Sequence, residues 1–185
     1  MNRVDKWKLM HREEMESWIN PQNNLVLIGD SCHPMLPYLA QGANSSIEDG
    51  AVLGLLLAPD HFTEKSQLPE TLQLFQSLRK ARSEEIAKET FKQRRDFHLR
   101  DGPEQKKRDE LMLSQLGKEI TVPFPSRSTC PEVQPWLYGY DAMKEVEAAM
   151  QKRKIAKTLP CPCAQCADRS NAQPQQHEKI IKMRL

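Results

Sequence analysis

The stretch that decides the fold lies at residues 25–44 and reads LVLIGDSCHPMLPYLAQGAN. Its first four residues form a continuous apolar run of strand length, which is typical of a strand buried on both faces. The run stops at Gly29-Asp30, and a loop punctuated by proline and glycine follows. We therefore expect one central strand at 25–28, then a loop, then a helix that starts at about Gln41–Ser45.

The residue order of this stretch predicts a ligand site. A carboxylate at the carboxyl end of a buried strand, here Asp30, stands where α/β folds bind ligands, and it can accept hydrogen bonds from a pair of sugar hydroxyls. The helix start presents free backbone N–H groups and a positive dipole end, which suit an anion or an electron-rich carbonyl. Gly42 lets a ligand approach the backbone closely because it has no Cβ. Asp30 by itself is more simply a turn or cap residue, but the whole string favours a ligand.

Size and charge exclude several function classes. At 185 residues the chain has room for one domain or for a piece of a larger one. The net charge of +2 comes from residues 151–185, which carry eight Lys or Arg against two acidic residues. No aromatic residues alternate with these basic ones, so we expect no nucleic-acid partner. The sequence has no apolar run long enough to span a membrane and no signal peptide, so we expect a cytoplasmic protein.

The remainder of the chain predicts helices. The spacing of apolar residues predicts a short amphipathic turn or helix within residues 7–19. The spacing of Ser45 and Glu48 predicts a capping box at the start of an apolar helix that ends at Pro59. A second helix is expected from near Pro69 to about Phe91.

Three more segments follow a helix break at 102–103. A third, mostly polar helix is expected at about 104–116, and an extended segment rich in proline and aromatic residues at 118–140. Asp141 is expected to cap a last helix that runs to about Lys154.

Three pieces of this sequence together resemble a known motif. They are GDSCHP at 29–34, QGAN at 41–44 and ED at 48–49, with Pro37 between the first two. They resemble the second FAD-binding motif of the flavin-dependent aromatic hydroxylases, typified by para-hydroxybenzoate hydroxylase and salicylate hydroxylase. The likeness continues through LPE at 68–70, HLRDGP at 98–103 and WLYGYD at 136–141.

The resemblance implies a cofactor, FAD, and a set of residues that bind it. Asp30 would hydrogen-bond the ribityl or neighbouring diphosphate region. The amides of Gly42, Ala43 and Asn44 would face the pyrimidine edge of the isoalloxazine ring. Pro37 would lie beside the flavin, with its carbonyl directed toward a hydroxyl of the substrate. The partners implied are NAD(P)H and a small aromatic or polyketide-like substrate.

A departure from the family limits this expectation. Family members begin with a βαβ unit that carries G-x-G-x-x-G, and this sequence contains no such triplet. We therefore expect an α/β fragment, mainly helical: residues 1–58 as the C-terminal segment of an FAD-binding domain, 59–157 as its helical extension, and 158–185 as a disordered tail. The function expected is that of an FAD-dependent monooxygenase, present as its C-terminal part. The alternative is a non-enzymatic helical remnant, or a protein that docks on a partner supplying a complementary N-terminal half.

Two other groups of residues could suggest chemistry, a cysteine cluster near the C-terminus and a histidine after the expected strand, but we predict no site at either. Cys161, Cys163 and Cys166, with His177, offer zinc ligands, but only one pair has the C-x₂-C spacing and no apolar residues surround them. We therefore predict no metal site. His33 is expected to pack within the turn after the strand rather than to act as a general base.

Overall fold

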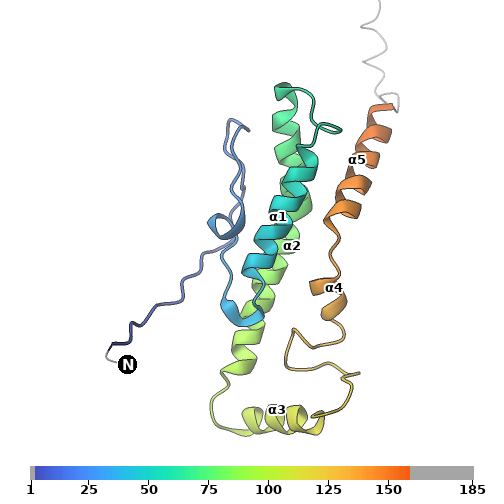
Figure 1. Ribbon diagram of the computed structural model, residues 1–185. Helices are drawn as coiled ribbons and strands as arrows, with labels where there is room; N and C mark the ends of the chain where they lie inside the picture. The colour runs from blue at the N-terminus through green and yellow to red at the C-terminus, as the bar shows by residue number, and fades with distance from the viewer. Residues whose placement is uncertain (1–2, 159–185) are drawn as a thin grey trace, which may run out of the picture. The chain divides into compact units, whose positions relative to one another are not determined.

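The computed structural model describes residues 3–158, and these are mainly helical, as predicted (Figure 1). The main helices are α1 (Gly42–Leu56), α2 (Leu68–Phe97), α3 (Pro103–Ser114), α4 (Gln134–Tyr138) and α5 (Ala142–Thr158). Three 3-10 turns accompany them: η1 (Gly29–Ser31), η2 (Pro37–Leu39) and η3 (Lys65–Gln67). None of the helices within residues 3–158 is both long enough and apolar enough to cross a bilayer.

The strand expected at 25–28 is not formed, so this prediction is wrong. Val26 makes only an isolated antiparallel bridge with Ile19, and the described residues contain no named strand. Leu25 and Ile28 are 53% and 41% exposed. A strand buried on both faces needs hydrogen-bonded neighbours on each side. Within residues 3–158 only the short stretch at 18–20 pairs with it, through the Leu27 N–H to the Trp18 carbonyl and the Asn20 N–H to the Leu25 carbonyl.

The amphipathic helix considered for residues 7–19 is also absent. Residues 3–15 carry no regular secondary structure, and the Trp7 side chain is 90% exposed. Trp18, in contrast, is buried against Phe75, with ring centroids 6.3 Å apart. The N-terminal segment is thus held to α2 by the Trp18 side chain, by a hydrogen bond from the Trp18 N–H to Gln76 and by an ion pair of Glu14 with Lys88, rather than by an amphipathic face.

Helix α1 begins earlier than its capping-box pattern predicts. The N-cap residue is Gln41, whose carbonyl accepts a hydrogen bond from the Ser45 N–H at 2.8 Å. Ser45 is therefore inside the first turn and fully buried, and Glu48 is occupied by ion pairs with Arg79 and Arg82. The box is not formed because these tertiary ion pairs hold the Glu48 carboxylate on the side of α2.

The later helices confirm the predictions from proline, glycine and aspartate. Pro69 lies in the first turn of α2, and Pro103 begins α3 after the break at Gly102. The Asp141 carboxylate accepts hydrogen bonds from the N–H groups of Met143 and Lys144 at 3.1 Å each, which caps α5 as expected.

The segment at 118–140 is irregular and includes the short helix α4. Its apolar residues Cys130, Val133 and Leu137 pack with Ile86 of α2 in a small buried cluster. A larger core holds α1, α2 and the start of α5 together, built from Trp18, Cys32, Val52, Leu56, Phe75 and Val146.

By its internal contacts the chain divides into Met1–Met150 and Gln151–Leu185, and the first unit contains every contact discussed below. The boundary expected between residues 58 and 59 stays a prediction. The cysteines at 161, 163 and 166 and most of the expected tail lie outside the described residues.

Candidate functional site

The turn that carries Asp30 is shaped by the glycine before it. Gly29 has a φ of +59°, in the left-handed region that side chains with a Cβ rarely adopt. A Cβ at this position would lie 2.7 Å from the Ser46 Oγ of α1, closer than real contacts allow. The glycine therefore sets both the direction of the backbone and the close approach of the turn to α1.

A buried aspartate, Asp49 of α1, holds this turn in place. Its Oδ2 accepts a hydrogen bond from the Gly29 N–H at 2.9 Å and lies 2.6 Å from the Nε2 of His33. Its Oδ1 accepts from the Nε of Arg79 at 2.8 Å. Asp49 and Arg79 are both 0% exposed. One carboxylate thus joins the turn, the loop after it and helix α2.

The pKa of Asp49 reflects these contacts. Burial favours the neutral acid and raises the pKa, but hydrogen bonds from His33, Arg79 and the Gly29 N–H outweigh burial, so the pKa lies below its ordinary value. The carboxylate is therefore ionised at neutral pH. The neighbouring imidazole carries a proton on Nε2, the nitrogen that faces this carboxylate.

A second ion pair ties the C-terminal segment to the same helices. Arg82 makes a bidentate pair with Glu48, with both N–O distances 2.8 Å. It also donates to the carbonyls of Trp136 and Leu137 at 2.8 and 3.2 Å, and its guanidinium lies 4.3 Å from the centroid of the Tyr140 ring. Through Glu48 and Arg82, helix α1 is thus connected both to α2 and to the segment that contains α4.

The structure brings Asp30 and the start of α1 together. A Cβ at Gly42 would lie 3.8 Å from the Oδ1 of Asp30. The Asp30 side chain is exposed, and no hydrogen bond or ion pair is formed to it by any residue within 3–158. A carboxylate without a protein partner therefore stands beside an open helix end.

The helix end itself presents donors to solvent. The first N–H groups of a helix have no intrahelical acceptor, and here they belong to Gly42, Ala43 and Asn44. Gly42 is half-buried, and the other two are exposed. The Asn44 side-chain amide donates to the Oε1 of Gln41, the N-cap residue, at 3.4 Å. Ala40, just before the helix, has a φ of +52° and turns the backbone into this orientation.

Pro37 lies apart from the helix end, at the start of η2, and is exposed. Its carbonyl accepts a hydrogen bond from the Ala40 N–H at 3.2 Å and retains a second lone pair. A hollow of about 230 Å³ lies beside the start of α1, lined by Gln41, Asn44, Ile47, Glu48, Leu137 and Tyr138.

These features fit the part of FAD that the sequence predicts. A flavin presents ribityl hydroxyls, which suit a free carboxylate, and an electron-rich pyrimidine edge, which suits open N–H groups at a positive helix end. Nothing within residues 3–158 competes for Asp30. The donor and acceptor set therefore matches the ring end of the cofactor.

Sequence reasoning missed the residues that support this site. Asp49 shares one buried face of α1 with Ser45, Val52 and Leu56, and Arg79 lies on the buried face of α2 between Phe75 and Ile86. Two opposite charges at core positions of neighbouring helices predict a buried pair, because an unpaired buried charge is costly. That pattern was available in the sequence and identifies Asp49 and Arg79. His33, expected to serve a structural role in the turn, bonds to this pair.

Cys32, His33 and Asp49 lie close enough to suggest a metal site. The Cys32 thiol, however, is 3.4 Å from the carbonyl oxygens of Leu27 and Gly29, and both oxygens of Asp49 already have partners. Burial, reinforced by the charge of Asp49, raises the pKa of Cys32 to about 12. A neutral thiol beside a guanidinium ion pair does not favour a cation, so we assign these residues to the support of the loop.

This pKa leads to a test of reactivity. Because the thiolate is the reactive form, the native Cys32 is expected to resist alkylation by iodoacetamide at pH 8 and to react fully in urea. Peptide mass mapping before and after unfolding measures the difference. Rapid labelling of Cys32 in the folded protein would contradict the burial described here.

Comparisons with known proteins identify the region around this site. Residues 3–97, about half of the chain, match the family described as FAD binding domain. The FAD-dependent monooxygenase OpS4 of Beauveria bassiana (strain ARSEF 2860) is 49% identical over 152 residues, covering 82% of this chain and 35% of that protein. The 3-amino-4-hydroxybenzoate 2-monooxygenase PtmB3 of Streptomyces platensis is 32% identical over 136 residues, covering 74% of this chain and 30% of that protein.

Solved structures agree with the sequence matches. The crystal structure of CtdE in complex with FAD and substrate 4 has a TM-score of 0.55 and 25% identity, covering 80% of this chain and 30% of that chain. FqzB, with a TM-score of 0.59 and 21% identity over 83% of this chain and 32% of that chain, shares the fold. The chain spans about a third of the length of the curated relatives it matches. The resemblance to flavin-dependent monooxygenases is confirmed, and FAD is the cofactor that this kind of domain binds.

Proposed function

Because the chain belongs to the FAD binding domain family, we propose that its loop and the start of α1 form the flavin-ring end of the cofactor site of a monooxygenase. The residues of this end are Asp30, Pro37, Gly42, Ala43 and Asn44. The observation that carries the proposal is the position of the Asp30 carboxylate, which has no hydrogen-bond or ion-pair partner among the described residues, beside the open N-terminus of α1.

Each residue has a role that follows from its chemistry. Asp30 accepts hydrogen bonds from hydroxyls of the flavin side chain. The N–H groups of Gly42, Ala43 and Asn44 stabilise negative charge at the pyrimidine edge, because they point out of a positive helix end. The Pro37 carbonyl offers its remaining lone pair to a hydroxyl of the substrate and so orients it.

When bound, FAD supplies the hydride acceptance and dioxygen activation that hydroxylation requires. We propose NADH or NADPH as the reductant and an aromatic or polyketide-like compound as the substrate. The network around Asp49 keeps Asp30 and the helix end in register, which preorganises the site. The adenosine-binding part of the domain is proposed to come from a complementary N-terminal half.

We favour this function over a non-enzymatic helical remnant because several relatives that match most of this chain are named monooxygenases. A cytoplasmic location and the domain boundary at 58/59 stand as further proposals. In this proposal residues 1–58 contact the cofactor, and residues 59–157 form the helices that support that segment.

Titration with FAD tests the assignment of Asp30. A hydrogen bond to a charged group contributes about 1.5–3 kcal/mol, so Asp30→Ala is expected to weaken FAD binding by about 10- to 100-fold. Quenching of flavin fluorescence on addition of the full chain gives the affinity. The variant Asp30→Asn retains an acceptor oxygen, so its FAD affinity is expected to lie between those of the wild type and Asp30→Ala.

Asp60→Ala is the matched control, because Asp60 is exposed and lies beyond the C-terminus of α1. It removes the same charge and is expected to bind FAD as the wild type does. Equal FAD affinity of the wild type and Asp30→Ala would refute the assignment.

A further inference from the structure

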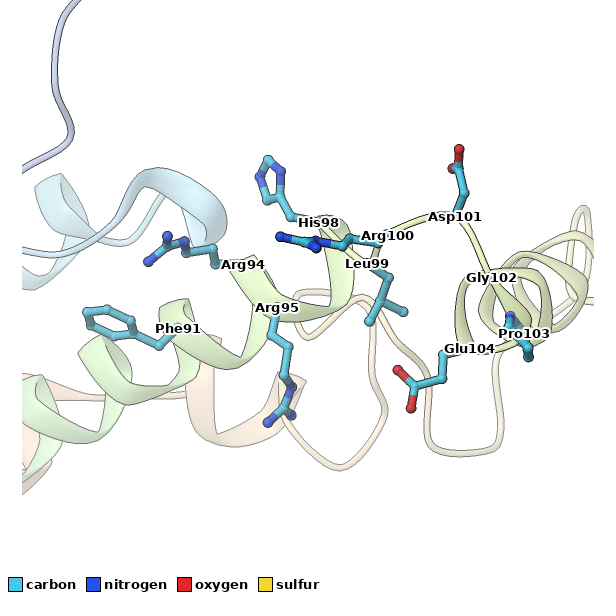
Figure 2. Close-up of a pocket in the computed structure, with 10 residues that line it drawn as sticks. All are labelled: Phe91, Arg94, Arg95, His98, Leu99, Arg100, Asp101, Gly102, Pro103 and Glu104. Carbon is cyan, nitrogen blue, oxygen red and sulfur yellow. The ribbon is translucent and has the colours of Figure 1, made fainter.

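A groove of about 950 Å³ lies at the junction of α2 and α3 (Figure 2), but its side chains do not converge on one ligand. The carboxylates of Asp101 and Glu104 point apart in Figure 2. The ring of Phe91 is already packed edge-to-face against His11, with ring centroids 5.0 Å apart. The groove therefore presents no defined site, and the smaller hollow beside the start of α1 is the stronger candidate.

This hollow, of about 230 Å³, lies on a different side of α1 from Asp30. Gly42 faces the Asp30 carboxylate, because a Cβ at Gly42 would lie 3.8 Å from the Asp30 Oδ1. Asn44, which lines the hollow, follows two residues later. Successive residues of an α-helix are rotated by about 100°, so Asn44 points about 160° away from Gly42. The hollow is therefore separate from the position of Asp30.

Arg82 fixes the two walls of the hollow relative to each other. One wall is the first part of α1, where Glu48 makes a bidentate ion pair with Arg82 at 2.8 Å. The other wall is the end of α4, where the carbonyls of Trp136 and Leu137 accept hydrogen bonds from Arg82 at 2.8 and 3.2 Å. The Leu137 side chain is buried at the base of the hollow. The hollow is thus held open by one side chain that contacts both walls.

Two exposed apolar side chains border the hollow. Ile47 of α1 is 69% exposed, and Tyr138 of α4 is 55% exposed. Single exposed apolar residues are common on protein surfaces, but these two belong to opposite walls of one hollow. A cavity of about 150 Å³ accepts benzene, so this hollow has room for one six-membered ring with small substituents. The phenol ring of Tyr138 offers such a ring a stacking partner.

The polar groups favour a neutral ring with an amide edge. Of the described residues that line the hollow, only Glu48 is charged, and it is neutralised by ion pairs with Arg79 and Arg82. The Asn44 carboxamide donates to Gln41 at 3.4 Å, and its side chain makes no other hydrogen bond within residues 3–158. Its oxygen and its second N–H are therefore available. A carboxamide pairs through these two groups with a donor and an acceptor on one ring edge, as asparagine does with a base.

We propose that this hollow is a second binding site of the chain, for a neutral six-membered cyclic amide. The ring of this lactam stacks on Tyr138, and its N–H and C=O pair with the side chain of Asn44. The site goes beyond the proposed function and does not rest on it, because the flavin assignment uses the backbone N–H of Asn44 and makes no use of Tyr138.

Titration of the full chain with 2-pyridone, a six-membered lactam, tests the proposal by ligand-observed NMR. Tyr138→Ala removes the stacking partner and is expected to weaken binding about three- to tenfold. Tyr138→Phe keeps the ring and is expected to bind as the wild type does. N-methyl-2-pyridone lacks the N–H and is expected to bind the wild type about tenfold more weakly than 2-pyridone. The control variant is Phe97→Ala, which removes a ring of similar exposure, 46%, from the last turn of α2 and is expected to leave binding unchanged.

Several results would overturn the assignment: no binding of 2-pyridone by the wild type, unchanged affinity in Tyr138→Ala, or benzoate binding as tightly as 2-pyridone. Circular dichroism establishes that each variant is folded. FAD titration of the same proteins separates the two proposals. Asp30→Ala is expected to lose FAD and keep 2-pyridone, and Tyr138→Ala the reverse, so either proposal can fail alone. A loss of FAD affinity in Tyr138→Ala would place the flavin itself in the hollow and contradict a separate site.

Discussion

Replacing Asp49 with alanine is expected to lower the free energy of unfolding by about 3–5 kcal/mol, the usual cost of breaking a buried ion pair. The variant removes the fully buried partner of Arg79, which keeps only its ion pair with Glu48 at 2.7 Å, and it leaves the Gly29 N–H without its acceptor. Because single domains are stable by only about 5–15 kcal/mol, this loss is a large fraction of the total. Urea denaturation at pH 7, followed by circular dichroism, measures it.

Two further variants make the result specific. Asp60→Ala removes an exposed carboxylate and is expected to change stability by less than about 0.5 kcal/mol. The double variant Asp49→Ala, Arg79→Met removes both charges and is expected to be more stable than Asp49→Ala alone. A loss below about 1 kcal/mol for Asp49→Ala would show that the network contributes little.

The same network predicts how stability depends on acid. The pKa of Asp49 in the folded chain lies below its ordinary value of 3.8, so the unfolded state binds the proton more tightly. Its contribution is present above pH 4 and is lost as the pH falls through the folded-state pKa. The stability difference between wild type and Asp49→Ala is therefore expected to shrink on acidification below pH 4.

Replacing Gly29 with alanine is expected to lower the free energy of unfolding by about 2–5 kcal/mol. The left-handed backbone at φ +59° costs a residue with a Cβ about 1–2 kcal/mol. The overlap with Ser46, whose Oγ would lie 2.7 Å from the new atom, adds a cost typical of overpacking, about 1–3 kcal/mol. Because Gly29 precedes Asp30, FAD affinity is expected to fall with stability. Thermal unfolding and FAD titration measure the two effects.

Ser46 separates the two causes. In a Ser46→Gly background the overlap is removed and only the backbone cost of Gly29→Ala remains, so the second substitution is expected to be less harmful there. A double-mutant cycle gives the difference directly. Equal costs in both backgrounds would show that steric overlap with Ser46 plays no part.

Local signals in the sequence predicted those elements that depend on local chemistry. Proline at 69, the glycine-proline break at 102–103 and the Asp141 cap placed the later helices because each acts within one or two turns of the backbone. The strand at 25–28 failed because strand pairing depends on partners elsewhere. The predicted capping box at Ser45 is absent because the Glu48 carboxylate forms ion pairs with arginines of α2 instead.

The candidate site divides in the same way. The order of residues in 25–44 by itself predicted a ligand site, since a glycine-aspartate turn followed by a glycine-opened helix presents a carboxylate and free N–H groups. The cofactor class came from the likeness of this stretch to a motif of the flavin-dependent hydroxylases. Only the tertiary structure decided how Asp30 meets the helix end. That placement depends on Asp49, which joins Gly29, His33 and Arg79 across 50 residues of sequence. The physical reason is that a buried charge is stable only when folding brings its partners to it.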